Sequence, residues 1–372
     1  MSLVSVVLLV DDFHKKKPTT MLAFFRNLHH KLLAHRARGG DLGRFGPAEF
    51  ESLENFFAEK FEPVEVVRDS AAGFSRLAVI GDLHGDLALF WATLCSQNCI
   101  DRSGNWTGDS KLVVQVGDFL DRGGRYDDEG NLLSEPGENE REEIDIMQYA
   151  WFLDCQARQY GGEVVLLSGN HEYMNFAGNF SGTTQVTNRG WGGPVADRRR
   201  WFRPDGTRLA NYFIKRHPVM LKVGRFVFVH GGLGKPCDRG SGSFDSYVLR
   251  VNADWVDYLA GRAKRLSKCV EHVLFSRQLS DEFQPDAEDC DRIFEKFLTQ
   301  VGLPDDAVLF VGHTPQVQDY QPTAGVNSVC GNRVWRVDVG ASEAFKRSDR
   351  AQGLLVFLND PTVGLRFQVV GV

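Results

Sequence analysis

Residues 76–86 have the sequence RLAVIGDLHGD, in which a short apolar run ends at two glycines that enclose Asp82 and His84. The run predicts a buried β-strand at residues 76–80, and glycine lets the backbone turn sharply where the strand ends. Side chains two positions apart lie on the same side of an extended segment. The sequence therefore predicts a strand that places a carboxylate and an imidazole together at its carboxyl end.

The same order of strand, glycine and polar side chain recurs twice. Apolar runs at residues 111–116 and 163–167 are followed by GDFLDRG at 117–123 and by SGNHE at 168–172. Helical patterns lie between the three runs, at residues 87–95 and 142–160. This βαβαβ alternation is typical of a layered α/β fold.

Two later apolar runs, at residues 225–229 and 307–311, end in histidine motifs. HGGL follows the first run at 230–233, and GHTP follows the second at 312–315; residues 334–337 and 354–358 are predicted as late strands. All five polar clusters follow predicted strands, where open α/β sheets place their ligand sites. The sequence thus predicts one site built from five turns.

The donor atoms in these clusters are carboxylate, imidazole and amide oxygen. That mixture suits Mn²⁺, Fe or Zn²⁺ better than an all-oxygen magnesium cage. Taken singly, such an Asp or Asn is more often a turn or capping residue, and a lone His is more often structural. Five glycine-flanked clusters favour a metal site, and two metals about 3.5–4 Å apart need a bridging anion. We assign the bridge to Asp118, which lies between the first motif and the later Asn and His motifs.

Three further residues have the chemistry that phosphate-ester hydrolysis requires beside its metals. Arg122 can clamp phosphoryl oxygens with its bidentate fork, although a surface salt bridge is the alternative. His171 follows Asn170 and points elsewhere, so that, held by Asp121, it can protonate the leaving group; a scaffold role is its alternative.

The motifs GDxHG, GDxxDRG, GNHE, HGG and a late GH occur here in this order, from Gly81 to His313. In this the chain resembles the phosphoprotein phosphatase branch of the calcineurin-like metallophosphoesterases, and SGNHEYMN at 168–175 is similar to the Shewanella-like protein phosphatases. The resemblance implies a four-layer α/β/β/α sandwich with mixed sheets.

The resemblance also implies roles for particular residues. It gives the first metal the ligands Asp82, His84 and Asp118. It gives the second metal the ligands Asp118, Asn170, His230 and His313. It implies that His171 is the catalytic acid with Asp121 as its partner, and that Arg122 and Arg277 bind phosphate. Two departures are Gly123-Gly124 after the first arginine and Phe275-Ser276 before the second.

We therefore expect a phosphoprotein phosphatase that hydrolyses phosphate monoesters by direct attack of a hydroxide bridging two divalent metals. One alternative is a diadenosine tetraphosphate hydrolase, which resembles the chain in its first three motifs. The other is an inactive, metal-binding scaffold for phosphorylated partners. The basic and aromatic insertion at residues 188–206 is either a substrate-facing flap or a long surface loop.

Composition limits the partners and the location. The net charge of −6 disfavours a nucleic-acid binder, and no stretch approaches the roughly 20 apolar residues of a transmembrane helix. Seven scattered cysteines fit a reducing compartment better than a disulfide framework, which favours the cytoplasm. Cys95 and Cys99 alone lie close enough for a redox pair. Nothing in the sequence indicates an oligomeric state.

The motifs begin near residue 75, so we expect residues 1–70 to form an N-terminal helical extension and residues 71–372 the catalytic domain. A basic, amphipathic helical pattern spans residues 21–33, and a second helical stretch lies near 48–60. The first helix either packs on the domain or serves in organelle targeting. Acidic residues and glycines at 127–145 predict a solvated loop that leads into a helix.

Overall fold

A computed structural model describes residues 48–123, 140–233, 242–280, 285–316, 325–342, 344, 352–360 and 364–371. The predicted helix at 21–33 and most of the acidic loop at 127–145 lie outside the described residues. None of the helices within these ranges has the length and apolar character that crossing a membrane requires.

The first predicted strands form the centre of a five-stranded sheet with the order β11-β10-β2-β3-β4. Three parallel strands carry the first three motifs: β2 (Arg76–Ile80), β3 (Lys111–Gln115) and β4 (Glu163–Leu166). Two antiparallel strands complete the sheet: β10 (Gln352–Asp360) and β11 (Gly364–Gly371). Every residue of β3 and β4 is buried, as expected for parallel strands covered on both faces.

The later strands form a six-stranded mixed sheet with the order β1-β5-β6-β7-β9-β8. Its strands are β1 (Val67–Arg68), β5 (Met220–Val223), β6 (Phe226–Val229), β7 (Val308–Val311), β8 (Asn327–Val329) and β9 (Val334–Arg336). The neighbours β6, β7 and β9 run parallel, so their carboxyl ends lie at one edge of the sheet.

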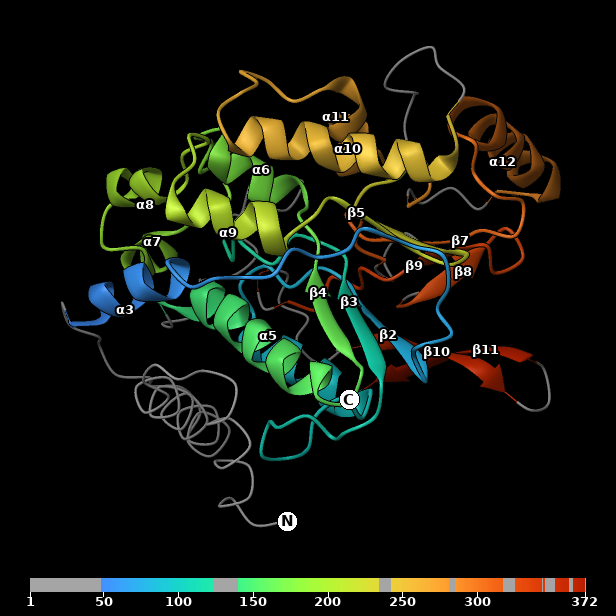
Figure 1. The fold of residues 1–372 in the computed structure, drawn as a ribbon, viewed down its shortest axis with the longest axis horizontal. Helices are drawn as coiled ribbons and strands as arrows, with labels where there is room; N and C mark the ends of the chain where they lie inside the picture. Colours follow the sequence, from blue (N-terminus) through green and yellow to red (C-terminus); the bar gives the residue numbers. More distant parts are fainter. Residues whose placement is uncertain are drawn as a thin grey trace, which may run out of the picture. The chain divides into compact units, whose positions relative to one another are not determined.

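Helices cover both sheets (Figure 1). The first sheet packs against α4 (Leu87–Ser96) and α5 (Glu142–Arg158), and the second packs against α10 (Phe244–Leu259). The other described helices are α3 (Ala48–Phe57), α6 (Asn170–Phe176), α7 (Gln185–Gly190), α8 (Val195–Trp201), α9 (Arg208–Arg216), α11 (Lys268–Phe275) and α12 (Ala287–Val301). The predicted α/β fold, a sandwich with mixed sheets, is confirmed.

The described part of the N-terminal extension packs on this fold. On α3, Phe57 lies 5.6 Å from the Trp201 ring and 5.4 Å from the Tyr212 ring, measured between centroids. Such aromatic pairs add to the free energy gained by burial. The division of the chain at residue 70 stays a prediction.

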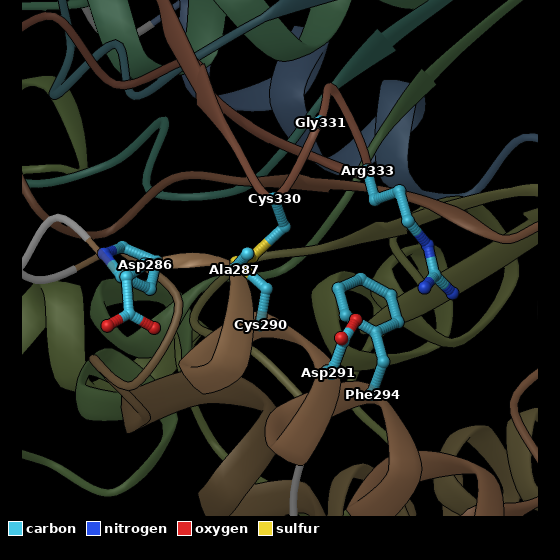
Figure 2. Close-up of a pocket in the computed structure, with 9 residues that line it drawn as sticks. Asp286, Ala287, Cys290, Asp291, Phe294, Cys330, Gly331 and Arg333 are labelled. Atoms are coloured by element: carbon cyan, nitrogen blue, oxygen red, sulfur yellow. A yellow bond between two sulfur atoms is a disulfide. The ribbon is translucent and has the colours of Figure 1, made fainter.

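The cysteines differ from expectation. Cys290 on α12 and Cys330 after β8 form a disulfide across a separation of 40 residues, and the bridge lies at a pocket of about 280 Å³ (Figure 2). This disulfide disagrees with the preference for a reducing compartment over a disulfide framework, because the fold joins cysteines that no local spacing relates. The cytoplasmic location loses this support and stays a prediction. No disulfide joins Cys95 to Cys99 in the structure, and the suggestion that the two form a redox pair stays a prediction.

Gly81 stands where the end of β2 meets the backbone that follows β9. A Cβ atom at this position would lie 2.1 Å from the carbonyl oxygen of Val337, far inside any contact distance. We expect Gly81→Ala to lower the free energy of unfolding by about 1–3 kcal/mol or more, because backbone must move to admit a methyl group. Urea titration of the wild type and of the Gly81→Ala protein measures the change in the free energy of unfolding.

Gly73→Ala is the matched control, since a Cβ at Gly73 meets nothing within 4 Å. Equal unfolding midpoints for the Gly81→Ala and Gly73→Ala proteins would contradict the close approach of β2 and β9.

Candidate metal centre and active site

The carboxyl ends of the two sheets meet, and this brings the predicted motifs together. After β6, the ring of His230 bonds through Nδ1 to the Val116 carbonyl oxygen after β3, at 3.0 Å. After β7, the Gly312 amide donates to the His230 carbonyl oxygen at 2.8 Å, and the His313 amide donates to the Asp82 carboxylate at 3.2 Å. Turns of both sheets therefore line one buried site.

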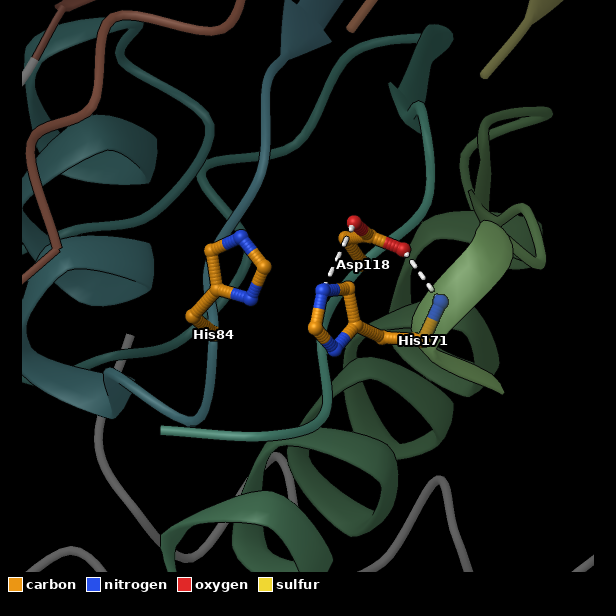
Figure 3. A group of neighbouring side chains, drawn as sticks. All are labelled: His84, Asp118 and His171. Atoms are coloured by element: carbon orange, nitrogen blue, oxygen red, sulfur yellow. Dashed lines mark hydrogen bonds and ion pairs between the residues drawn. The ribbon is translucent and has the colours of Figure 1, made fainter. Parts of the chain in front are cut away.

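Two groups of side chains have the spacing of metal ligands. One consists of His84, Asp118 and His171 (Figure 3), and the other of Asp118, His230 and His313. Within each group the ligand atoms lie within 4.8 Å of one another. Asp118 belongs to both groups, so a single carboxylate lies between two candidate metal positions.

Backbone carbonyls orient two of the histidine rings. Nδ1 of His84 lies 3.2 Å from the Leu120 carbonyl oxygen, just as Nδ1 of His230 pairs with that of Val116. This leaves Nε2 of each ring for the site, and such outer hydrogen bonds are usual for metal-binding histidines. Nε2 of His230 lies 3.3 Å from the Asp118 carboxylate and 2.9 Å from the Asn170 side-chain oxygen.

The charge at the site favours a cation. Burial, together with Asp338 and Asp118, raises the pKa of Asp82 well above its usual value. Burial and the neighbouring His230 lower the pKa of His313 to about 3, so its ring is neutral at pH 7 and able to bind a metal. Gathered carboxylates and neutral imidazoles fit a divalent metal centre, because a bound cation relieves the repulsion among the acids.

His171 and Asp121 form a hydrogen-bonded pair beside this centre. Nδ1 of His171 lies 2.9 Å from one Asp121 oxygen, and its amide donates to Asp118 at 2.9 Å. Nε2 lies 3.9 Å from the other Asp118 oxygen and faces the site. Burial acts to raise the pKa of Asp121, but the bond from His171 and the charge of Arg198 outweigh it and lower that pKa. Asp121 is therefore ionised and holds the imidazole by one nitrogen.

The two predicted arginines occupy different surroundings. Arg122 is buried, forms an ion pair with Glu142 and donates to the Gly85 carbonyl oxygen at 3.3 Å. Arg277 is exposed and donates to Thr314 Oγ1 at 2.9 Å and to the carbonyl oxygen of His313 at 3.3 Å. Arg277 thus lies against the turn that holds His313 and Thr314, whereas Arg122 lies against Gly85 of the first motif.

Backbone conformation also marks the site. Eight non-glycine residues in the described ranges have positive φ, and four of them are predicted site residues: His84, Asp118, Asp121 and His313. Positive φ is uncommon outside glycine and is concentrated at functional sites, where surrounding bonds maintain it. The amides of Asp118 and Leu120 are held in this way by the carboxylate of Glu172, each at 2.9 Å.

Glu172 and Asp338 are absent from the predicted set. Glu172 also accepts the amide of Gly169, at 2.7 Å, so it ties the GDxxDRG turn to the GNHE turn. Asp338 follows β9, and burial raises its pKa to about 6. The sequence Val337-Asp338-Val339-Gly340 repeats the order of strand, acid and glycine, which is a local signal for a further acid at this edge of the sheet.

The insertion at residues 188–206 is neither a flap nor a long loop. It folds into the end of α7 and the helix α8, and the side chains of Trp191 and Arg198 are completely buried. The Arg198 guanidinium contacts Asp121 at 2.9 Å and Glu143 at 2.7 Å. The insertion therefore contacts Asp121 through a buried side chain, while Pro194, Val195 and Arg199 of the same segment are exposed.

Comparison with known proteins agrees with this architecture. A family model for calcineurin-like phosphoesterases matches residues 75–323. The chain is 29% identical to Shewanella-like protein phosphatase 2 of Arabidopsis thaliana, over 81% of this chain and 78% of that protein. It is 24% identical to Shewanella-like protein phosphatase 1 of Plasmodium berghei, over 72% of this chain and 67% of that protein.

A solved structure shares the fold: the cold-active protein-tyrosine phosphatase of a psychrophilic Shewanella species. Its TM-score is 0.53 at 20% identity, and 78% of each chain is covered. The similarity to the Shewanella-like protein phosphatases predicted from SGNHEYMN is thus confirmed. The family match spans more than half of the chain and includes all five motifs, so the protein belongs to the calcineurin-like phosphoesterase family.

Proposed function

We propose that this protein is a phosphoprotein phosphatase that hydrolyses phosphate monoesters at a centre of two divalent metals. The observation that carries the proposal is the position of Asp118 in both ligand groups, beside the pair of His171 and Asp121. The names of the two relatives compared above, both protein phosphatases, support a phosphoprotein as the substrate.

Six residues would hold the metals in this proposal. The first metal would take Asp82, His84 and Asp118, and the second would take Asp118, Asn170, His230 and His313. This mixture of oxygen and imidazole donors suits Mn²⁺, Fe or Zn²⁺. When bound, the metals would activate a water nucleophile and neutralise charge on the phosphoryl oxygens.

His171 would donate the proton that the leaving alkoxide requires. Its Nδ1 is taken by Asp121, so Nε2 is the atom that faces the substrate. The buried carboxylate would stabilise the protonated ring and fix its orientation, which general acid catalysis needs. Attack by activated water requires no phosphoenzyme, in keeping with an assignment of His171 as acid rather than nucleophile.

Arg277 and Arg122 would bind the phosphoryl group. Arg277 is the better placed of the two, because its guanidinium lies 3.3 Å from the carbonyl oxygen of the ligand His313 and stays exposed. The positive charge of Arg122 is already paired with the carboxylate of Glu142, which would weaken its attraction for a phosphoryl group.

Arg277→Met should raise KM for a phosphopeptide and lower kcat/KM by roughly 10- to 100-fold, because a charge-assisted hydrogen bond to phosphate contributes about 1.5–3 kcal/mol. Steady-state kinetics measure both constants. Arg262→Met is the matched control, since Arg262 pairs with Asp257 at 2.7 Å and belongs to no ligand turn. Equal kinetic constants for the two variants would remove Arg277 from the proposed site.

A substrate panel with elemental analysis tests the function as a whole. Phosphoserine, phosphothreonine and phosphotyrosine peptides, p-nitrophenyl phosphate and diadenosine tetraphosphate would be compared on the manganese-loaded protein. We expect peptide hydrolysis with two metals per chain. A preference for the dinucleotide of about tenfold or more in kcat/KM would favour the hydrolase alternative. Phosphopeptide binding without any hydrolysis would favour the inactive scaffold.

A further inference from the structure

A completely buried arginine on the insertion helix α8 bonds to the carboxylate that holds His171. Each donor group of the Arg198 guanidinium has its own acceptor: Nε bonds to Asn175 Oδ1 at 2.6 Å, Nη1 to Glu143 Oε2 at 2.7 Å and Nη2 to Asp121 Oδ1 at 2.9 Å. Three acceptors around one guanidinium restrict its position, since the fork of Arg is rigid.

Both oxygens of the Asp121 carboxylate are hydrogen-bonded, so rotation of the group would break these bonds. Its Oδ1 accepts from Arg198 and from Asn175 Nδ2, each at 2.9 Å, and its Oδ2 pairs with His171 Nδ1 at 2.9 Å. The Asn175 side chain also donates to the backbone oxygen of His171 at 2.9 Å. Arg198 and Asn175 thus hold one side of the carboxylate while His171 occupies the other.

Aromatic rings surround the Arg198 guanidinium and exclude water from it. Its guanidinium carbon lies 5.6 Å from the Trp191 ring centre and 5.1 Å from that of Phe202. Trp191 also donates through Nε1 to Glu143 at 2.7 Å, and Glu143 accepts the amide of Asp121 at 2.9 Å. Away from water, such charge-assisted bonds are stronger than at the surface.

We propose that Arg198 is a positioning residue for proton transfer, which sets the orientation of His171 through Asp121. The inference rests on the proposed function, in which His171 protonates the leaving group. The competing explanation is that Arg198 only neutralises two buried carboxylates and so stabilises the fold, as buried ion pairs often do.

The two explanations predict different effects of the leaving group. A serine alkoxide leaves only with a proton, whereas p-nitrophenolate is stable as an anion and needs little help. Loss of positioning therefore slows phosphoserine hydrolysis more than p-nitrophenyl phosphate hydrolysis. Loss of folded protein slows both equally.

The test compares Arg198→Met and Arg198→Lys with the wild type on a phosphoserine peptide and on p-nitrophenyl phosphate. For Arg198→Met we expect kcat on the peptide to fall roughly 100-fold, a smaller fall on p-nitrophenyl phosphate, and unchanged KM and metal content. Arg198→Lys keeps the charge among the carboxylates, so it folds, but it cannot reach three acceptors and should show a smaller, equally selective loss. Arg200→Met is the matched control, because Arg200 is exposed and pairs with Asp197 at 3.1 Å.

Adding Arg198→Lys to a His171→Asn protein provides a second measurement. If Arg198 acts through His171, the second substitution should not lower kcat on the peptide further. Equal losses on both substrates, or a full additional loss in the His171→Asn protein, would overturn the positioning role while the wild type remains active. A wild type without phosphopeptide hydrolysis would instead overturn the proposed function itself.

Discussion

His171→Asn is expected to lower kcat on a phosphoserine peptide by roughly 10²- to 10⁴-fold, the range that a positioned general acid contributes. The imidazole that pairs with Asp121 is lost, while asparagine keeps the backbone amide that bonds to Asp118 at 2.9 Å. The proposed ligands do not include His171, so both metals should stay bound. Steady-state kinetics together with elemental analysis of the same preparation separate the two effects.

His272→Asn serves as the control, since His272 lies on α11 and outside both ligand groups. The loss should be smaller on p-nitrophenyl phosphate, whose leaving group needs no proton. An unchanged kcat with full metal content would mean that another group donates the proton. Loss of one metal would make His171 a ligand instead, as its place in the first ligand group allows.

The strands that carry the motifs were predictable, because in each case an apolar run is followed directly by a glycine-containing polar turn. The prediction for residues 76–80 matches β2 (Arg76–Ile80), and Asp86 at the end of the same motif caps α4 through the Leu89 amide at 2.8 Å. The strands β1, β5, β8 and β11 were not predicted, because none of them is followed by one of the five motifs. These strands form because they pair with neighbouring strands in the folded sheets, and a local sequence pattern does not reveal such pairing.

The support beneath the site was not predictable, because its partners lie far apart in the chain. Arg198 stands in a run of three arginines, a pattern typical of a solvated face, and only the fold shows that it reaches Asp121, 77 positions away. Gly190, Gly192 and Gly193 likewise favoured a surface loop for this segment. The disulfide between Cys290 and Cys330 likewise has no local signal.

Asp118→Asn should remove most metal binding and most activity, because one carboxylate is shared by both ligand groups. Asparagine keeps the shape but lacks the negative charge that bridges two cations. Burial acts to raise the pKa of Asp118, yet His230 and His171 hold that pKa well below its usual value, so the wild-type residue is charged at pH 7. Elemental analysis and phosphopeptide kinetics measure the two losses.

Folding stability gives an independent measure of the same loss. A metal that binds only the native state stabilises it by about 2.7 kcal/mol when its concentration is 100 times Kd. Manganese should therefore raise the unfolding free energy of the wild type but scarcely that of Asp118→Asn. Asp306→Asn is the control, because the Asp306 carboxylate is exposed and lies 3.7 Å from Arg225. The Asp306→Asn protein should respond to manganese as the wild type does. If Asp118→Asn kept the full manganese effect, each metal would be held without a shared carboxylate, and the bridging role of Asp118 would have to be given up.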